Sequence, residues 1–334
     1  MSCWSGLDER YTLKGMPHIT NIMGKPVDRG LEIKNVVDGE SGVMMYLELH
    51  EEKQRQHAKE FHESLGETCA VGLRLVKNWF GSGRTVISDS WFSSVKLLKE
   101  LSERGLYFMG LVKQNYALFP KNHLTAWGAG KLNGEAPTRG DSILFSSQVD
   151  DKSKMYALGY MSHKAKFILA NRGTTLPAPD VVLTRHKIKQ EDGLCKLDKR
   201  QYSIKVPQMV HMFFDHFNAV DSHNQLRQGS LALERNWLTR TWWHRVFATI
   251  LGITVVDAYK AYKYEFPRFA AMFEEPVTFL QFVDELAYSL IFNPFLDTHR
   301  VSHHKAAPSS DPPSSVRYAF LHFLIMLVFD VFWS

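Results

Sequence analysis

Three aspartates stand in sequence contexts that suit metal chemistry. Asp89 directly follows a short apolar run at 85–88 with a strand pattern, Asp8 precedes a predicted hairpin, and Asp221 lies in a segment of helical character. A carboxylate at the C-terminal end of a strand is held at the edge where α/β folds place ligands and metals. Three such carboxylates converging from separate elements would suit two hard divalent cations. The sequence therefore offers a candidate metal site.

Each aspartate also has an ordinary structural explanation. Asp8 would serve as a turn or capping residue, Asp89 as the N-cap of the helix that follows it, and Asp221 as a solvated helix residue. Residue types alone leave both interpretations open.

The first part of the chain alternates strand and helix patterns. Runs at 31–37 and 43–49 flank the turn-forming sequence DGESG at 38–42, which predicts a β-hairpin. Further patterns predict a helix over 57–80, a strand over 85–88, a helix over 95–101 closed by Gly105, and a strand over 107–112. Such alternation indicates an α/β fold, which would hold Asp89 at a strand end.

The pattern loosens between residues 114 and 206. Gly and Pro recur there, and short strand-like pieces occur at 142–145, 155–160, 166–170 and 181–184, which predicts an inserted β-rich subdomain. Helical patterns resume near Met209, with long helices expected over 238–264 and 279–292. We therefore divide the chain into 1–113, 114–206, 207–300 and 301–334. The last part is a Pro-rich linker and an apolar tail at 318–333, shorter than the ~20 residues that span a bilayer, so we do not expect a membrane anchor.

Positive charge is concentrated within the loose segment. Residues 164–205 hold ten Lys and Arg against four Asp and Glu, a net of +6, whereas the whole chain carries +5. Such a concentration is typical of a polyanion partner, although a solvated basic loop has the same composition. The three cysteines are far apart and fit free thiols in a reducing compartment. The residues after Met1 contain no apolar run of the kind that marks a secretory signal, so we do not expect one.

Several sequence blocks together carry a resemblance to one family. They are DE at 8–9 followed by KG at 14–15, KP at 25–26 and GLEIK at 30–34; DSWFSS at 89–94 with LL at 97–98 and Gly105; AVDSHNQ at 219–225; and WWHRVF at 242–247. In this order, across roughly residues 6–265, they resemble the transposase domain of piggyBac elements.

The resemblance implies a fold and a chemistry. The fold is an RNase H-like α/β core with an insertion between the second and third acidic blocks, completed by a helical C-terminal part. The chemistry is metal-dependent cleavage and transfer of DNA strands, with Asp8, Asp89 and Asp221 as catalytic metal ligands for Mg²⁺ or Mn²⁺. DNA becomes the expected partner and Lys187, Lys189, Lys199 and Arg200 its expected contacts. A homodimer is left open, and the location is expected to be nuclear or cytoplasmic.

The sequence also departs from the family pattern. Asn224 stands where the third block has a further acid, so we expect it to bind metal through its carbonyl oxygen and more weakly. Only residues 1–7 precede Asp8, and no cysteine lies near the histidines at 299–304 to complete a zinc site. We therefore expect impaired catalysis. The alternatives are a non-catalytic DNA-binding or chromatin-associated module, a scaffold for an uncharged partner, or a gene fragment without function.

Overall fold

The computed structural model describes most of the 334-residue chain. The described ranges are 2–7, 11–12, 14–25, 27–113, 117–132, 134–148, 154–178, 181–191, 194–204, 206–237, 239–268 and 275–292, with the backbone alone for 181–191 and 194–203. The chain splits into two compact units, the first comprising Met1–Cys3, Glu32–Val36 and Tyr46–Val220, and the second Trp4–Leu31, Val37–Met45 and Asp221–Ser334. The predicted linker at 306–315 and tail at 318–333 lie outside the described residues.

A four-stranded sheet forms near the start of the chain. Its strands run in the order β1-β3-β2, with β4 paired to β3; their bounds are Ser2–Gly6 (β1), Thr20–Asn21 (β2), Arg29–Val37 (β3) and Met44–Leu49 (β4). The predicted hairpin is confirmed as β3 and β4. Its turn is fixed by the Asp38 carboxylate, which accepts hydrogen bonds from the Ser41 amide at 2.8 Å and from the Ser41 hydroxyl at 2.7 Å.

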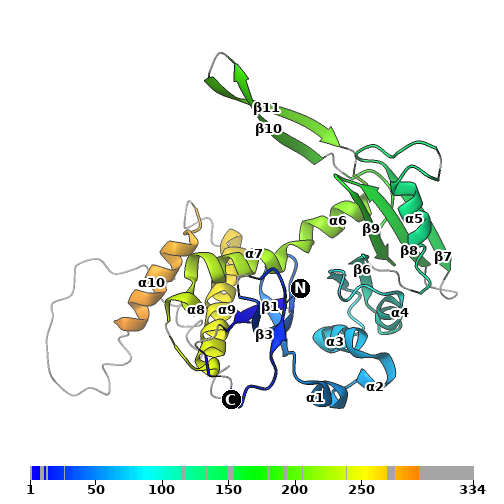
Figure 1. Ribbon diagram of the computed structural model, residues 1–334. Helices are drawn as coiled ribbons and strands as arrows, with labels where there is room; N and C mark the ends of the chain where they lie inside the picture. The colour runs from blue at the N-terminus through cyan, green and yellow to red at the C-terminus, as the bar shows by residue number, and fades with distance from the viewer. Residues whose placement is uncertain are drawn as a thin grey trace, which may run out of the picture. The chain divides into compact units, whose positions relative to one another are not determined.

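The first unit is built on a five-stranded sheet. The strand order is β5-β6-β9-β8-β7, in which β5 and β6 are parallel and the remaining pairs antiparallel (Figure 1). The bounds are Thr85–Ser88 (β5), Tyr107–Leu111 (β6), Ser142–Gln148 (β7), Lys154–Met161 (β8) and Ala165–Ala170 (β9). The parallel strands β5 and β6 are joined through the helix α4 (Val95–Glu103), and Asp89 lies in this connection, directly after β5.

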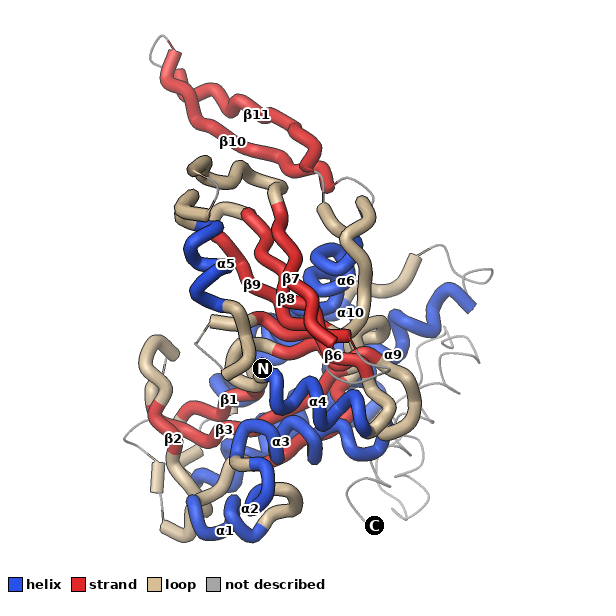
Figure 2. Tube along the Cα trace, turned by 90° about the vertical axis from the view of Figure 1, so that its right-hand side faces the viewer, coloured by secondary structure: helices blue, strands red, loops and turns tan. Residues whose placement is uncertain are grey.

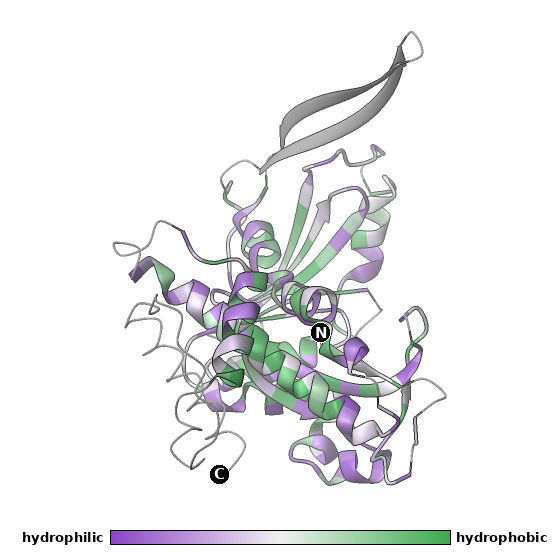
Figure 3. Ribbon diagram, turned by 90° about the vertical axis from the view of Figure 1, so that its left-hand side faces the viewer, coloured by the Kyte–Doolittle hydropathy of each residue, from purple (hydrophilic) through white to green (hydrophobic). Residues whose placement is uncertain are grey.

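Helices cover both faces of this sheet because the strands β6, β8 and β9 bury apolar residues on both sides. Phe108 packs with α3 (Glu67–Val76), α4 (Val95–Glu103) and α5 (Lys121–Gly128), whereas its neighbour Met109 packs with α6 (Gln208–Phe217). Successive strand residues face opposite sides, so the two clusters lie on different faces of the sheet. Figure 2 shows α3 and α4 side by side, and Figure 3 shows the apolar character of the sheet strands.

The single helix predicted over 57–80 is wrong. The segment instead forms four short pieces: α1 (Lys53–Ala58), α2 (His62–Leu65), α3 and the 3₁₀ turn η1 (Lys77–Trp79). Phe61 has a φ of 67° and Gly66 a φ of 79°, and backbone in the left-handed region cannot continue a right-handed helix. The apolar spacing was helical, but the backbone turns twice within it.

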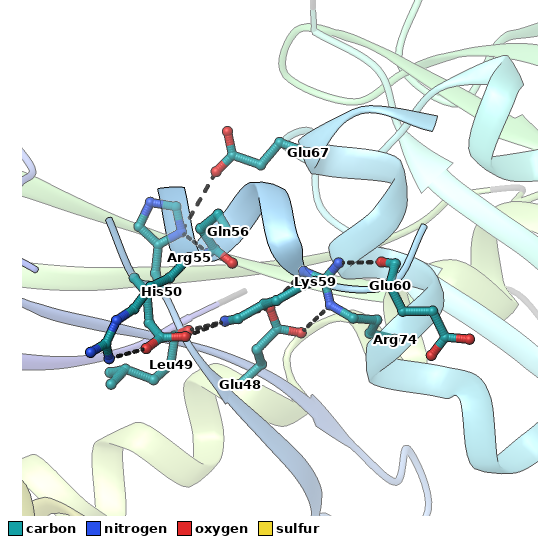
Figure 4. A network of polar contacts seen from close by, with 10 residues as sticks. Glu48, Leu49, His50, Arg55, Gln56, Lys59, Glu60, Glu67 and Arg74 are labelled. Atoms are coloured by element: carbon teal, nitrogen blue, oxygen red, sulfur yellow. Dashed lines mark hydrogen bonds and ion pairs between the residues drawn. The ribbon is translucent and has the colours of Figure 1, made fainter. Parts of the chain in front are cut away.

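A polar network holds these short helices against β4 (Figure 4). Arg74 of α3 donates from Nε and Nη2 to the two carboxylate oxygens of Glu48, at 2.9 and 2.7 Å. Lys59 donates to the same carboxylate at 3.3 Å and to the Leu49 carbonyl at 3.0 Å. The paired guanidinium–carboxylate hydrogen bonds fix the orientation of α3 and its distance from β4. They hold the short helices in place where no continuous helix does so.

Two long strands form a separate ribbon in the first unit. β10 (Val181–Glu191) and β11 (Leu194–Ile204) pair antiparallel along eleven positions as a two-stranded sheet (Figure 1). Only the first four residues of β10 had been predicted as strand. The predicted division of the chain at 113/114 and 206/207 stays a prediction.

The described C-terminal part of the chain is helical. Its elements are α7 (Ala219–Gln225), the π-helical turn η2 (Leu226–Leu231), α8 (Leu233–Asn236), α9 (Trp242–Glu265), the 3₁₀ turn η3 (Phe266–Arg268) and α10 (Phe279–Ile291). Val256 and Tyr259 of α9 pack against Phe279 and Phe282 of α10 in one buried cluster. Among the described helices, none is both long and apolar enough to cross a membrane.

Candidate functional site

Asp89 lies immediately after β5 in a tight hydrogen-bonded turn. The Trp91 amide donates to its Oδ1 at 3.0 Å, and the Ser93 hydroxyl donates to its backbone carbonyl at 2.7 Å. The N-cap of α4 is Ser94, whose hydroxyl accepts from the Leu97 amide at 3.2 Å. The alternative of Asp89 as the helix cap is therefore wrong, and its carboxylate instead closes the turn after β5.

A buried lysine stands beside this turn. The Lys34 side chain is 5% exposed; its Nζ lies 2.8 Å from Glu32 Oε1 and 3.6 Å from the centroid of the Trp91 ring. Glu32 supplies the neutralising charge that a buried ammonium requires, and the indole face adds a cation–π attraction. The sequence singled out Lys34 only as part of a motif; its contact with the Asp89 turn comes from tertiary packing.

Asp221 and Asn224 lie three residues apart on α7, so they are neighbours on one side of that helix. Asp221 is exposed. The Asn224 Oδ1 accepts a hydrogen bond from Arg227 Nη2 at 3.2 Å. Its carbonyl oxygen, the predicted metal donor, is thus engaged by a cation.

Arg227 is itself a buried charge that the sequence did not reveal. Its side chain is 1% exposed and forms an ion pair with Glu234, which is 9% exposed. A Cβ at Gly252 of α9 would come within 3.0 Å of the Arg227 Cγ, so the glycine leaves room for the arginine stem. The guanidinium therefore links η2 to α7 and α8, while the stem of the side chain packs on α9.

His223 is a second buried residue of this region. Its side chain is fully buried, and its Nε2 lies 3.1 Å from Asp257 Oδ1. The same carboxylate oxygen accepts the Met44 amide hydrogen at 2.7 Å. His223 thus anchors α7 to α9 within the second unit.

Of the three described residues that were predicted to bind metal, two have oxygen donors that suit a hard cation and one does not. The carboxylates of Asp89 and Asp221 are the ligand type that Mg²⁺ and Mn²⁺ prefer, whereas the buried guanidinium beside Asn224 opposes a cation at that oxygen. Asp8 lies outside the described residues, and Asp89 and Asp221 belong to different units. Their convergence stays a prediction. No group of three or more His, Cys, Asp or Glu residues is placed to hold a metal within the described ranges.

The predicted DNA contacts fall on the β10–β11 ribbon. Lys187 stands opposite Asp198, Lys189 opposite Lys196, Arg200 opposite Arg185, and Lys199 opposite His186. Because alternate strand residues face opposite sides, Lys187, Lys189 and Arg200 share one face of the ribbon and Lys199 belongs to the other. In the register, two of the pairs assigned to the first face join residues of like charge, Lys189 with Lys196 and Arg185 with Arg200.

Comparison with known proteins gives a family match and a structural match. Residues 5–259 match the family model described as Transposase IS4. The fold resembles the cryo-EM structure of a piggyBac transposase synaptic complex with hairpin DNA, with a TM-score of 0.62 and 17% sequence identity; the alignment covers 94% of this chain and 58% of that chain. The chain thus spans little more than half the length of that relative. No curated protein matches. The predicted RNase H-like α/β fold is confirmed.

Proposed function

The chain belongs to the Transposase IS4 family, and from this premise we propose that it is a piggyBac-like, DNA-associated transposase domain whose Asp8, Asp89 and Asp221 together hold divalent metal ions. The observation that carries the proposal is the position of Asp89. It follows the parallel strand β5 in a turn that is closed by the Trp91 amide and the Ser93 hydroxyl. This is where an α/β fold presents a rigid carboxylate to a ligand.

The chemistry assigned to these residues is cleavage of a DNA phosphodiester. Bound divalent ions supply an activated water and stabilise the charge on the attacking and leaving oxygens. In this proposal the protein positions the carboxylates: Asp89 is fixed by its turn, and the Lys34–Glu32 pair fixes Trp91, which closes that turn. Asp221 is presented from the first turn of α7.

We expect the catalysis to be weak because of Asn224. The amide carries no charge, and its oxygen already accepts a hydrogen bond from the buried Arg227. The fixed positive charge next to the third block lowers the affinity for a second dication.

The test is nicking of supercoiled plasmid DNA that carries matched transposon ends, with purified full chain and Mn²⁺ or Mg²⁺. Slow nicking that disappears in Asp89→Ala and persists in Asp215→Ala, a half-exposed acid paired to His211, supports the proposal. Nicking that survives Asp89→Ala would contradict it. Asn224→Asp tests the cause of the weakness: because it restores the missing carboxylate, we expect faster nicking, and an unchanged rate would show that the missing charge at residue 224 is not the cause.

A second candidate function, DNA binding without cleavage, is favoured by the register of the ribbon. The face that holds Lys187, Lys189 and Arg200 also holds Arg185 and Lys196, with Asp198 the acid opposite Lys187. A two-stranded ribbon fits a DNA groove, and phosphates would relieve the like-charge pairs. The proposal places the protein with DNA in the nucleus and leaves a homodimer open.

Neutralising Lys187, Lys189, Lys199 and Arg200 together to Gln should weaken duplex binding for all sequences alike. Each lost phosphate contact should also reduce the slope of log K against log salt by about 0.9. As single changes, Lys187→Gln, on the face with Lys189 and Arg200, should lower the slope more than Lys199→Gln on the other face. An unchanged slope in the fourfold variant would remove the ribbon as a DNA contact.

A further inference from the structure

Two of the three proposed metal ligands come from segments of the second unit, whose longest described helix is α9. Asp8 follows Leu7, the residue after β1, and Asp221 lies in α7. The distance between these two carboxylates must be set by whatever contacts both segments. The helix α9 contacts each of them through a buried polar side chain.

The contact with β1 is made by Thr249. Its hydroxyl donates to the Ser5 Oγ at 3.0 Å, and both residues are 0% exposed. The same Thr249 oxygen lies 3.1 Å from the backbone carbonyl oxygen one turn earlier in α9, so the helix backbone orients the hydroxyl. Because a buried hydroxyl is costly unless it is hydrogen-bonded, this pair fixes β1 to α9 at Ser5.

The chain has little freedom between Ser5 and Leu7. A Cβ on Gly30 of β3 would lie 2.3 Å from the Ser5 carbonyl oxygen, so β1 and β3 approach each other closely at this point. The Leu7 amide donates to the Arg29 carbonyl at 2.9 Å, and Leu7 is buried. A shift of β1 relative to α9 would therefore be passed on to Asp8, the next residue in the chain.

The contact with α7 is made by Asp257. Its Oδ1 lies 3.1 Å from Nε2 of the buried His223, two positions after Asp221. Thr249 and Asp257 are eight positions apart in the same helix, a spacing that places residues in one stripe along it. The two contacts are therefore about 12 Å apart along the axis of α9, and a single helix carries both.

We propose that α9 sets the distance between Asp8 and Asp221, and that Thr249 is the positioning residue for Asp8. The inference rests on the proposed function, because it takes these two carboxylates as ligands of one metal site. Thr249 acts through Ser5 and β1 and contributes no ligand itself. Small divalent ions such as Mg²⁺ and Mn²⁺ prefer octahedral coordination, so a displaced carboxylate weakens their binding even when every ligand is present.

The test is Mn²⁺ binding to the full chain, followed by the electron paramagnetic resonance signal of the free ion. Thr249→Val keeps the shape of the side chain but removes the hydroxyl, and it should lower the affinity at least about threefold, within the range that the loss of one hydrogen bond produces. Thr249→Ser keeps the hydroxyl and should retain the wild-type affinity. Thr254→Val is the matched control on α9, because the Thr254 hydroxyl donates within the helix, to the Ile250 carbonyl at 3.1 Å, and should leave the affinity unchanged.

A second comparison shows whether Thr249 acts through Asp8. The loss caused by Thr249→Val should vanish when Asp8 is already replaced by Ala, because no ligand then remains to be positioned. Without metal, hydrogen exchange of the Leu7 amide should be faster in Thr249→Val than in Thr254→Val, because β1 is held less firmly. An equal loss of affinity in the Asp8→Ala background, an equal loss in Thr254→Val, or unchanged exchange at Leu7 would overturn the proposal.

Failure of this inference differs from failure of the proposed function. If Asp8→Ala binds Mn²⁺ as tightly as the wild type, the proposed metal site is contradicted and the inference fails with it. If Asp8→Ala weakens binding but Thr249→Val does not, the metal site stands and only the positioning role of Thr249 is overturned.

Discussion

The buried ion pair between Arg227 and Glu234 should dominate the stability of the second unit. Glu234→Gln keeps the shape of the side chain but leaves the guanidinium, which is 1% exposed, without its counter-charge. Removing one partner of a buried pair typically costs about 3–5 kcal/mol, because the remaining charge stays desolvated. At ~2–4 °C per kcal/mol for a domain of 150–250 residues, the unfolding midpoint of the unit should fall by about 6–20 °C.

The loss should be largest where Arg227 is packed. Its stem fills the space left by Gly252 on α9, and its Nη2 donates to Asn224 on α7. Hydrogen exchange of the α9 amides near the buried residues Thr249 and Ile253 therefore reports the local cost. This readout is preferable to a single melting curve, because two compact units need not unfold in one transition.

Two comparisons decide whether the buried charge is the cause. Glu60→Gln breaks a pair with Lys77 whose side chains are about half exposed, at 49% and 52%, and should cost less than about 1 kcal/mol. The double replacement Arg227→Met with Glu234→Leu should recover most of the stability, because apolar residues of similar volume avoid desolvation. If Glu234→Gln costs no more than Glu60→Gln, or if the double replacement is as unstable as the single one, the reasoning is refuted.

Two further predictions concern the first unit. Burial raises the pKa of the Cys69 thiol from 9.0 to about 11. At pH 8 its reaction with a thiol reagent should therefore be about a hundredfold slower than that of an exposed cysteine. Because the unfolded chain loses this proton at a lower pH than the folded protein, the free energy of unfolding should fall as the pH rises from 9 towards 11. A fast-reacting Cys69 in the folded protein would show that the core is open. Gly105→Ala should lower the free energy of unfolding by more than about 1 kcal/mol in denaturant unfolding, because the φ of Gly105 is +70° and the added Cβ would lie 2.9 Å from the Gly81 Cα. Gly134→Ala is the control and should cost less, because Gly134 has a φ of +80° but open space around it.

Local patterns predicted the elements that depend on local sequence. The strand at 85–88 is β5 with identical bounds, and the hairpin predicted from the turn at 38–42 is β3 and β4. β11 escaped prediction because its sequence, LCKLDKRQYSI, is largely polar, and its strand character depends on pairing with β10. The helix over 57–80 failed at two breaks. Gly66 is a glycine that the apolar spacing passed over, whereas Phe61 adopts the left-handed region without being a glycine, so no residue type marks that break.

The candidate residues were singled out from motifs, but their surroundings were not predicted. Asp89 and Asp221 were chosen from their sequence blocks, and their role as metal ligands stays a prediction. The burial of His223 and Arg227 was missed because Asp257 and Glu234, their charged partners, are brought to them only by packing of α7, α8 and α9. Lys34 likewise meets Trp91 through tertiary contact across more than fifty residues of chain.

The central claim is that Asp8, Asp89 and Asp221 form one metal site. The most direct measurement is Mn²⁺ binding to the full chain, followed by the electron paramagnetic resonance signal of the free ion. Asp89→Ala and Asp221→Ala should each lower the affinity by at least about tenfold, whereas Asp215→Ala should leave it unchanged. Mn²⁺ affinity that depends on Asp89 but not on Asp221, or on neither, would contradict the claim.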